Sequence, residues 1–247
     1  MSLCVFLGPT LSQTEAEAIL PARYLPPVRR GAVAAALREY QPSRIAIIDG
    51  VFEQAPSVWH KEILWALSEG VDIWGASSMG ALRAAELEQF GMRGYGRIFE
   101  AYRSGLFAPF DAPFEDDDEV AVAHGPSGGE AFSTVAMVDV RATLVAALEE
   151  GVIGRAACLS IASAVKAIFF KDRSWRSVLS AVAETDVPAA ECHALCEWLP
   201  NGAVSLKRED ALGLLRHLAT DPPPPPPPCF HFERTLLWEI AALGREA

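Results

Sequence analysis

VDIWGASSMGALRAAELEQ, residues 71–89, is the stretch that decides the fold of this chain. Val71 to Trp74 form a short apolar run that is typical of a buried strand. Gly75 to Ser78 make a turn of small residues, and a helical pattern follows from Met79 to about Gln89. Strand, tight turn and helix in immediate succession indicate one unit of a parallel α/β sheet.

Two similar apolar runs precede this unit, Leu3–Leu7 and Arg44–Asp49, and helical patterns separate them. The alternation predicts a parallel sheet that is covered by helices on both faces. Ligands of such sheets collect at the carboxyl ends of the strands. Here these ends are polar or rich in glycine: Gly8-Pro9-Thr10, Asp49-Gly50 and Gly75 to Ser78.

We therefore expect an α/β fold, a small parallel sheet flanked by helices in Rossmann-like layering, followed by a mostly helical C-terminal half. Beyond Phe90 the sequence predicts a Gly-rich turn over 91–96, an acidic loop over 111–119 and two short strands within 120–140. The expected segments are an α/β catalytic core over 1–140, a helical region over 141–220, a proline-rich spacer over 221–229 and a C-terminal helix over 230–247. Pro222 to Pro228 are seven consecutive prolines, which favour a stiff extended spacer.

Composition excludes several classes of function. With 21 Lys+Arg against 32 Asp+Glu, the formal net charge is −11, which argues against binding nucleic acid. There is no apolar run of about 18 residues, so we expect no membrane span. The N-terminus lacks the features of a signal peptide, and five scattered cysteines do not form a disulfide framework. These features favour a cytoplasmic protein.

A serine on a tight strand-to-helix turn can act as a nucleophile, because the first amides of the helix stabilise a developing oxyanion. Ala76-Ser77-Ser78-Met79-Gly80 fits such an elbow, with the amides of Met79 or Gly80 as oxyanion donors. The alternative is that Ser77 or Ser78 only caps the helix.

The nucleophile needs a base, and Lys61 is the candidate. On a helix over 57–69 it has Val58, Leu64 and Trp65 as neighbours, so we expect desolvation to lower its pKa. The alternative is a lysine that extends its amine into water. The same helix predicts Glu62 and Glu69 on a solvent-facing stripe and a structural role for His60.

Together these segments resemble the TfuA family, the companions of YcaO enzymes in peptide-backbone thioamidation. The resemblance covers about the first 150 residues. It is carried by Ile47-Ile48-Asp49-Gly50, His60-Lys61-Glu62-Ile63-Leu64, Gly75 to Ala84, Gly91-Met92, Gly94-Tyr95-Gly96, Tyr102, Gly105 and Asp118-Glu119-Val120-Ala121.

The resemblance implies a hydrolase that acts on a thiocarboxylated ubiquitin-like sulfur carrier of the ThiS type and releases sulfide beside YcaO. Lys61 would be the base and Ser78 the nucleophile, with Ser77 as the alternative. The expected partners are a YcaO protein, the ThiS-like carrier and a precursor peptide bound through YcaO; a homodimer is left open. The remaining substrate-binding candidates are Gly8, Asp49 and Gly75 at the strand ends, Met79 and Gly80 at the helix start, and Arg83 near that start. We expect Gly8, Gly50 and Gly75 to leave room for the slim tail of the carrier. For Arg83, an ion pair with Glu86 is the alternative to a substrate contact.

Two other classes of function remain open at this stage. One is a non-catalytic adaptor that docks YcaO, its substrate and the carrier; the other is a domain that binds phosphate at the turn over 75–80. No cofactor or metal is expected. Cys192, His193 and Cys196 fall short of a zinc site and favour buried apolar cysteines. Asp111 and Glu115 to Glu119 favour a solvated acidic loop, with a cation or partner contact as the alternative.

Overall fold

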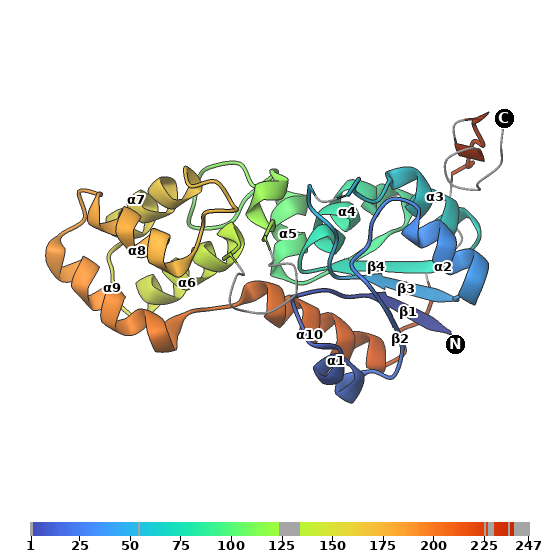
Figure 1. Ribbon diagram of the computed structural model, residues 1–247, viewed down its shortest axis with the longest axis horizontal. Helices are drawn as coiled ribbons and strands as arrows, with labels where there is room; N and C mark the ends of the chain where they lie inside the picture. Colours follow the sequence, from blue (N-terminus) through green and yellow to red (C-terminus); the bar gives the residue numbers. More distant parts are fainter. Residues whose placement is uncertain are drawn as a thin grey trace. The chain divides into compact units, whose positions relative to one another are not determined.

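The computed structural model covers residues 1–247 and describes all of them except 1, 54, 124–133, 225, 227–229, 237 and 240–247. Its contacts divide the chain into two compact units (Figure 1). Unit 1 comprises Met1–Ser104 with Arg208–Ala247, and unit 2 comprises Gly105–Lys207. The segment boundaries expected from the sequence stay predictions. Among the described residues, no helix is long and apolar enough to cross a membrane.

Unit 1 is built on a five-stranded sheet in which all neighbouring strands are parallel. The strands are β1 (Leu3–Phe6), β2 (Arg23–Leu25), β3 (Arg44–Ile47), β4 (Asp72–Ala76) and β5 (Arg93–Tyr95). Their order is β2-β1-β3-β4-β5. The chain steps outward from β1 to β2 and then back across to β3, so the topological switch point lies between β1 and β3, where open sheets of this type bind ligands.

Helices cover both faces of the sheet, which confirms the expected α/β class (Figure 1). One face carries α2 (Ala32–Tyr40), α3 (His60–Ser68) and α4 (Met79–Leu87), and the other carries α1 (Gln13–Ile19) and α10 (Leu206–Ala219). The predicted capping box of Ser12 and Glu15 begins α1.

The helix α10 comes from the far end of the sequence, yet it completes the core of unit 1. Leu214, Leu215 and Leu218 pack in one cluster with Val5 and Trp74 of the sheet. Asp210 accepts hydrogen bonds from the amides of Arg97 and Ile98, which begin α5 (Arg97–Ser104). Burial raises the pKa of Asp210 to about 6, while these amides act in the opposite direction.

Two of the strands differ from the sequence expectation. β2 was not predicted, and β5 lies where the sequence suggested only a Gly-rich turn. Each has three residues, and each forms an edge of the sheet. Such short strands carry too little alternation to be read from sequence, and pairing with a long neighbour stabilises them instead.

Unit 2 is mostly helical, as expected for the second half. Its elements are the 3-10 helix η2 (Asp117–Glu119) and the helices α6 (Met137–Glu149), α7 (Arg155–Lys166), α8 (Trp175–Ala183) and α9 (Ala189–Gly202). The two strands expected within 120–140 are not found in its described part, and 124–133 lie outside the described residues.

The acidic stretch of unit 2 is not a solvated loop, so that interpretation was wrong for its last residues. Glu119 is fully buried, and both of its carboxylate oxygens accept from the guanidinium of Arg141. Asp118 pairs with Arg173 and Lys166. These pairs leave the acidic residues balanced by cations, and no group of three or more metal-ligating side chains occurs among the described residues.

The closest packing in unit 1 is between α4 and the strands beneath it. A Cβ added to Gly80 would lie 1.7 Å from the carbonyl oxygen of Ile47, and a Cβ added to Gly75 would lie 2.0 Å from the carbonyl oxygen of Gly80. Backbone therefore lies directly on backbone, and only glycine fits at either position.

We predict that Gly80→Ala lowers the free energy of unfolding by about 3 kcal/mol, because the methyl group forces helix and strand apart. Chemical denaturation measures the change. Gly154→Ala is the matched control, since its Cβ would meet nothing nearer than 3.5 Å, and we expect it to cost less than about 1 kcal/mol. Equal losses in both variants would contradict the packing argument.

Candidate active site at the carboxyl edge of the sheet

The turn between β4 and α4 is strained at Ser77. This residue has a φ of +68°, in the left-handed region that residues other than glycine rarely adopt. The amide of Ser78 donates to the carbonyl oxygen of Ala76 at 2.8 Å, so the chain reverses around Ser77 in a three-residue γ-turn. Strained serines in this position are typical of the nucleophile elbow of hydrolases.

Both serine hydroxyls of this turn are buried, and neither caps the helix. Ser77 is 0% exposed, and its Oγ has no hydrogen-bond partner among the described residues. Ser78 is 1% exposed and is the N-cap residue of α4, but its side chain makes no capping hydrogen bond. The simple alternative of a capping serine therefore does not explain this turn.

The two amides expected to bind an oxyanion differ in their surroundings. The Gly80 amide is directed at the carbonyl oxygen of Ile48, at 3.4 Å. Met79 occupies the first position of α4, where a helix provides no acceptor for the amide. The Met79 amide is thus the better candidate donor at this helix end.

Asp49 ties the loops at the switch point together. Its carboxylate accepts from the amides of Gly8 and Thr10, at 2.9 and 3.2 Å, and from the Thr10 hydroxyl at 2.6 Å. The Asp49 carboxylate therefore positions the loop after β1 against the end of β3.

The room that Gly8 and Gly50 were expected to leave for a slim substrate tail is already filled. A Cβ on Gly8 would lie 2.6 Å from Pro27, and a Cβ on Gly50 would lie 2.6 Å from Cβ of Met79. These glycines therefore allow the loops to pack closely, and they do not indicate a channel for the substrate.

His60, Arg83 and Glu86 form a cluster between α3 and α4. Glu86 accepts from Arg83 and lies 2.8 Å from Nε2 of His60, so the expected ion pair of Arg83 with Glu86 is present. Although burial opposes it, these hydrogen bonds lower the pKa of Glu86. Arg83 and Glu86 lie five and eight residues past Ser78, about 7 and 12 Å along the helix axis. The first turn of α3 therefore lies beside the middle of α4.

Lys61, in that first turn of α3, contacts the C-terminal segment of the chain. Its amine donates to the Thr235 hydroxyl at 3.0 Å and lies 5.6 Å from the ring centre of Phe232. Among the described residues, the amine makes no hydrogen bond with Ser77 or Ser78. The structure thus brings the two serines and the helix end together, and it holds the proposed base elsewhere.

The segment that holds Lys61 is anchored by an aromatic cluster. Trp238 is 1% exposed and packs on Ala34 of α2, on Trp65 of α3 and on Phe232. Residues 230–235 are not helical, whereas 236, 238 and 239 are, and the rest of the predicted C-terminal helix over 230–247 lies outside the described residues. Sequence reasoning missed this cluster, although Trp65, four residues after Lys61 on the same helix, was a local signal for an aromatic contact there.

The expectation that Glu62, the neighbour of Lys61, faces solvent was wrong. It is fully buried rather than solvent-facing, and its carboxylate accepts from the amides of Gly31 and Trp59 at 2.7 and 3.2 Å. Burial raises the pKa of Glu62, and the amides partly offset this effect. One carboxylate therefore links the starts of α2 and α3.

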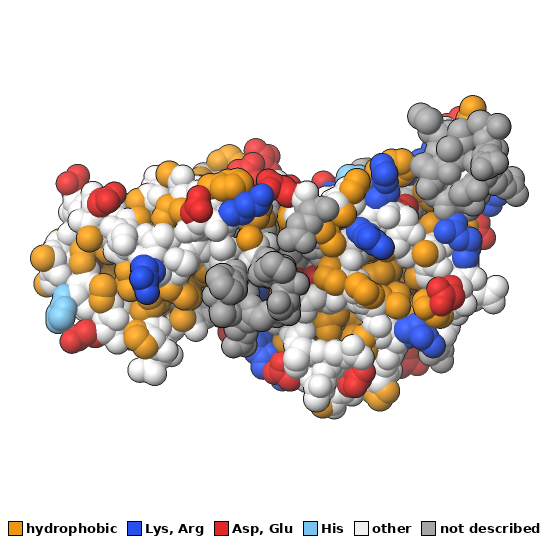
Figure 2. All heavy atoms as spheres, in the orientation of Figure 1, with side chains coloured by type: hydrophobic (Ala, Val, Ile, Leu, Met, Phe, Trp, Pro, Cys, Tyr) orange, Lys and Arg blue, Asp and Glu red, His pale blue; other side chains and the backbone are white. Residues whose placement is uncertain are grey.

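The described side chains on the face seen in Figure 2 carry charges of both signs: Lys and Arg are interspersed with Asp and Glu and form no continuous basic stripe there. The formal net charge of the whole chain is −11.

A strained, buried serine between a parallel strand and a closely packed helix places the chain among α/β proteins with a nucleophile-type elbow. Residues 49–174 match the family model described as TfuA-like protein, which is slightly more than half of the chain. The chain therefore belongs to the TfuA-like family, which links it to thioamidation-associated biosynthesis. The match includes Lys61, Ser77, Ser78 and Arg83. No curated protein matches the chain.

We predict that Ser77→Gly raises the free energy of unfolding by about 1 kcal/mol, because glycine adopts a positive φ without strain. Thermal and chemical denaturation measure the change. Ser78→Gly is the matched control, and we expect it to be neutral or destabilising, since Ser78 has a negative φ. A loss of stability in Ser77→Gly would contradict the strained turn.

Proposed function

We propose that this protein is a hydrolase of a thiocarboxylated, ubiquitin-like sulfur carrier and supplies sulfide to a YcaO partner during thioamidation. The observation that carries the proposal is the Ser77 turn, where strain is combined with a buried, unpartnered hydroxyl beside the start of α4. Strain of this kind is retained when a surrounding structure enforces it, and it is concentrated at functional sites.

The reaction follows from the chemistry of the thiocarboxylate. Ser77 Oγ attacks the carbonyl carbon while its proton passes to the amine nitrogen of Lys61, and the Met79 amide stabilises the oxyanion. As the carbon–sulfur bond breaks, Lys61 passes this proton to the sulfur, so that hydrogen sulfide anion leaves and the amine can act again as a base. Water then hydrolyses the acyl-serine, with Lys61 as base, and leaves the carrier with an ordinary carboxylate. The helix start favours the anionic substrate by about 0.3–1 kcal/mol.

This reaction requires the amine of Lys61 to leave its contact with Thr235. We infer that the segment around Phe232 and Trp238 holds the free protein in a resting state, and that partner binding releases it. The carrier or YcaO would do so by competing for the aromatic cluster on α2 and α3.

A non-catalytic adaptor is the second candidate, and two observations favour it. Both serine hydroxyls are at most 1% exposed, and the amine of Lys61 has other contacts. An adaptor would retain its partners when the serines are replaced, so the same variants separate the two functions.

Sulfide release from a thiocarboxylated ThiS-type carrier tests the proposal. We predict that Ser77→Ala reduces the rate to background and that Lys61→Met reduces it by about 10²- to 10⁴-fold, as expected for loss of a general base. Ser78→Ala is the informative comparison, because a selective loss there would make Ser78 the nucleophile. Lys171→Met, at an exposed lysine of unit 2, is the control. Full sulfide release in both serine variants would exclude the hydrolase.

The resting state makes a separate prediction. Trp238→Ala should loosen the segment and raise the rate at which an amine-reactive ester labels Lys61, because the contact with Thr235 is lost. Thr235→Val removes the hydroxyl that accepts from Lys61 but leaves the aromatic cluster intact, so we expect a smaller increase in the labelling rate. Peptide mass spectrometry measures the labelling.

Leu236→Ala is the matched control, since Leu236 is 68% exposed. If the proposed reaction is correct, the variants that label faster should also release sulfide faster. An unchanged labelling rate in Trp238→Ala would contradict the resting state. The serine chemistry would still be tested separately by the Ser77 and Ser78 variants.

A further inference from the structure

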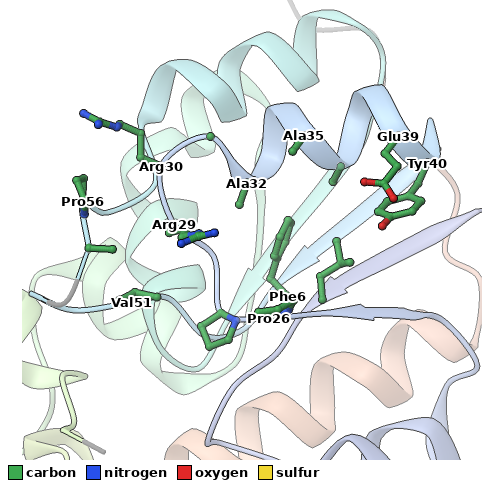
Figure 3. A pocket seen from close by; sticks show the side chains of 15 residues that line it. Phe6, Pro26, Arg29, Arg30, Ala32, Ala35, Glu39, Tyr40, Val51 and Pro56 are labelled. Carbon is green, nitrogen blue, oxygen red and sulfur yellow. The ribbon is translucent and has the colours of Figure 1, made fainter. Parts of the chain in front are cut away.

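A hollow of about 730 Å³ lies in unit 1 between helix α2 and the strands β1 and β2 (Figure 3). Phe6 and Leu25, which are paired in register, form its floor, and Ala32, Ala35 and Ala36 form the helical wall. Three alanines on one helix face are too small to fill the space above the edge strand. The size is that of a site for a short peptide or a small ligand.

The two ends of this slot carry opposite charges. Arg29 lies at the end where α2 begins and reaches over the hollow, whereas Arg30 points away from it and lies over the ring of Trp59 (Figure 3). Arg29 is exposed, and its guanidinium has no acceptor among the described residues. Glu39 and Tyr40 lie at the far end of the slot, where the Tyr40 hydroxyl donates to Glu39 and the guanidinium of Arg23 lies 4.3 Å from the centre of the Tyr40 ring. Ala32 to Glu39 span about 10 Å along the helix.

The slot is separate from the Ser77 turn. Ser77 follows β4, whereas the slot lies over β1 and β2, and β3 lies between. Adjacent strands are about 4.8 Å apart, so β1 and β4 are about 10 Å apart. A ligand in the slot would therefore contribute binding and not the reacting bond.

Length and charge together indicate the occupant. An extended peptide advances about 3.4 Å per residue, so three residues match the length of the helical wall from Ala32 to Glu39. Arg29 favours a carboxylate, and Glu39 favours a cation. Pro26 and Pro27 in the wall have no amide hydrogen, so full strand pairing with the guest is prevented and recognition depends on the ends and the apolar floor.

We propose that this slot binds the C-terminal peptide of a partner protein, with the terminal carboxylate at Arg29, an apolar last side chain over Phe6 and a basic side chain three residues earlier at Glu39. The inference goes beyond the proposed function, since it assigns a docking site that the chemistry at Ser77 does not use.

Fluorescence anisotropy with the full chain tests the proposal. The probe is a labelled hexapeptide, Gly-Ser-Lys-Ala-Ala-Leu, with a free carboxylate; its C-terminally amidated form and a form with Glu in place of Lys are compared. We expect each change to weaken binding at least about tenfold, because each removes one of the charged contacts.

Variants of the protein locate the site. Ala35→Leu fills the slot with a good helix former and should abolish binding without lowering the melting temperature. Arg29→Ala should weaken binding about tenfold, whereas Arg176→Ala, at an exposed arginine of unit 2, should leave it unchanged. Ser77→Ala should bind the peptide normally, which separates this proposal from the hydrolase.

Equal binding of the free and amidated peptides would overturn the proposal, as would peptide binding that survives Ala35→Leu. Decanoate is the competing probe for a small amphipathic anion. If decanoate binds in a manner blocked by Ala35→Leu and the peptide does not bind, the slot is a small-molecule site and the peptide assignment is wrong.

Discussion

The contact between Gly75 and Gly80 is the constraint on which the site depends. It seats the backbone of α4 directly on β3 and β4, with no side chain between. Because the helix begins so close to the strand that precedes it, the chain must reverse within one or two residues. That reversal forces the left-handed φ at Ser77, buries both serine hydroxyls and directs the first amides of α4 toward the carboxyl edge of the sheet. A looser junction would relieve the strain and lose this arrangement.

The sequence was sufficient to predict the three central strands of the sheet, β1, β3 and β4, and the turn after β4. The apolar runs that became β1, β3 and β4 are buried on both faces, which is why they lack polar alternation and can be recognised. The elbow can also be recognised from its own residues, because they are small and follow directly after a strand. The edge strands β2 and β5 could not be read, because their stability comes from one neighbour rather than from their own three residues.

The directions of the side chains on α3 could not be predicted from the local sequence pattern. A helical wheel of α3 assigns Glu62 to solvent and Lys61 to an apolar setting, but the wheel does not include what packs against the helix. Glu62 is buried because the start of α2 presents amides to it, and Lys61 turns to Thr235, 174 residues away in sequence. Both differences come from contacts distant in sequence, whereas the choice of Ser78 over Ser77 as the nucleophile, which rested on motif register, stays a prediction.

The proline run gives a reason why the contact with Lys61 persists. At the start of the run, Arg44 and Arg93 donate to the carbonyl oxygens of Pro222 and Pro223 at 2.6 and 3.1 Å, and after the run Phe230 contacts Phe90. Seven consecutive prolines have few conformations even in an unfolded chain, so joining these two anchors costs less entropy than a flexible linker of the same length. The segment that follows is thereby kept near α3 at a high effective concentration. In the proposed reaction, a partner that frees Lys61 would have to replace the aromatic contacts of Trp238, and this requirement would make the activity of the serine turn depend on that partner.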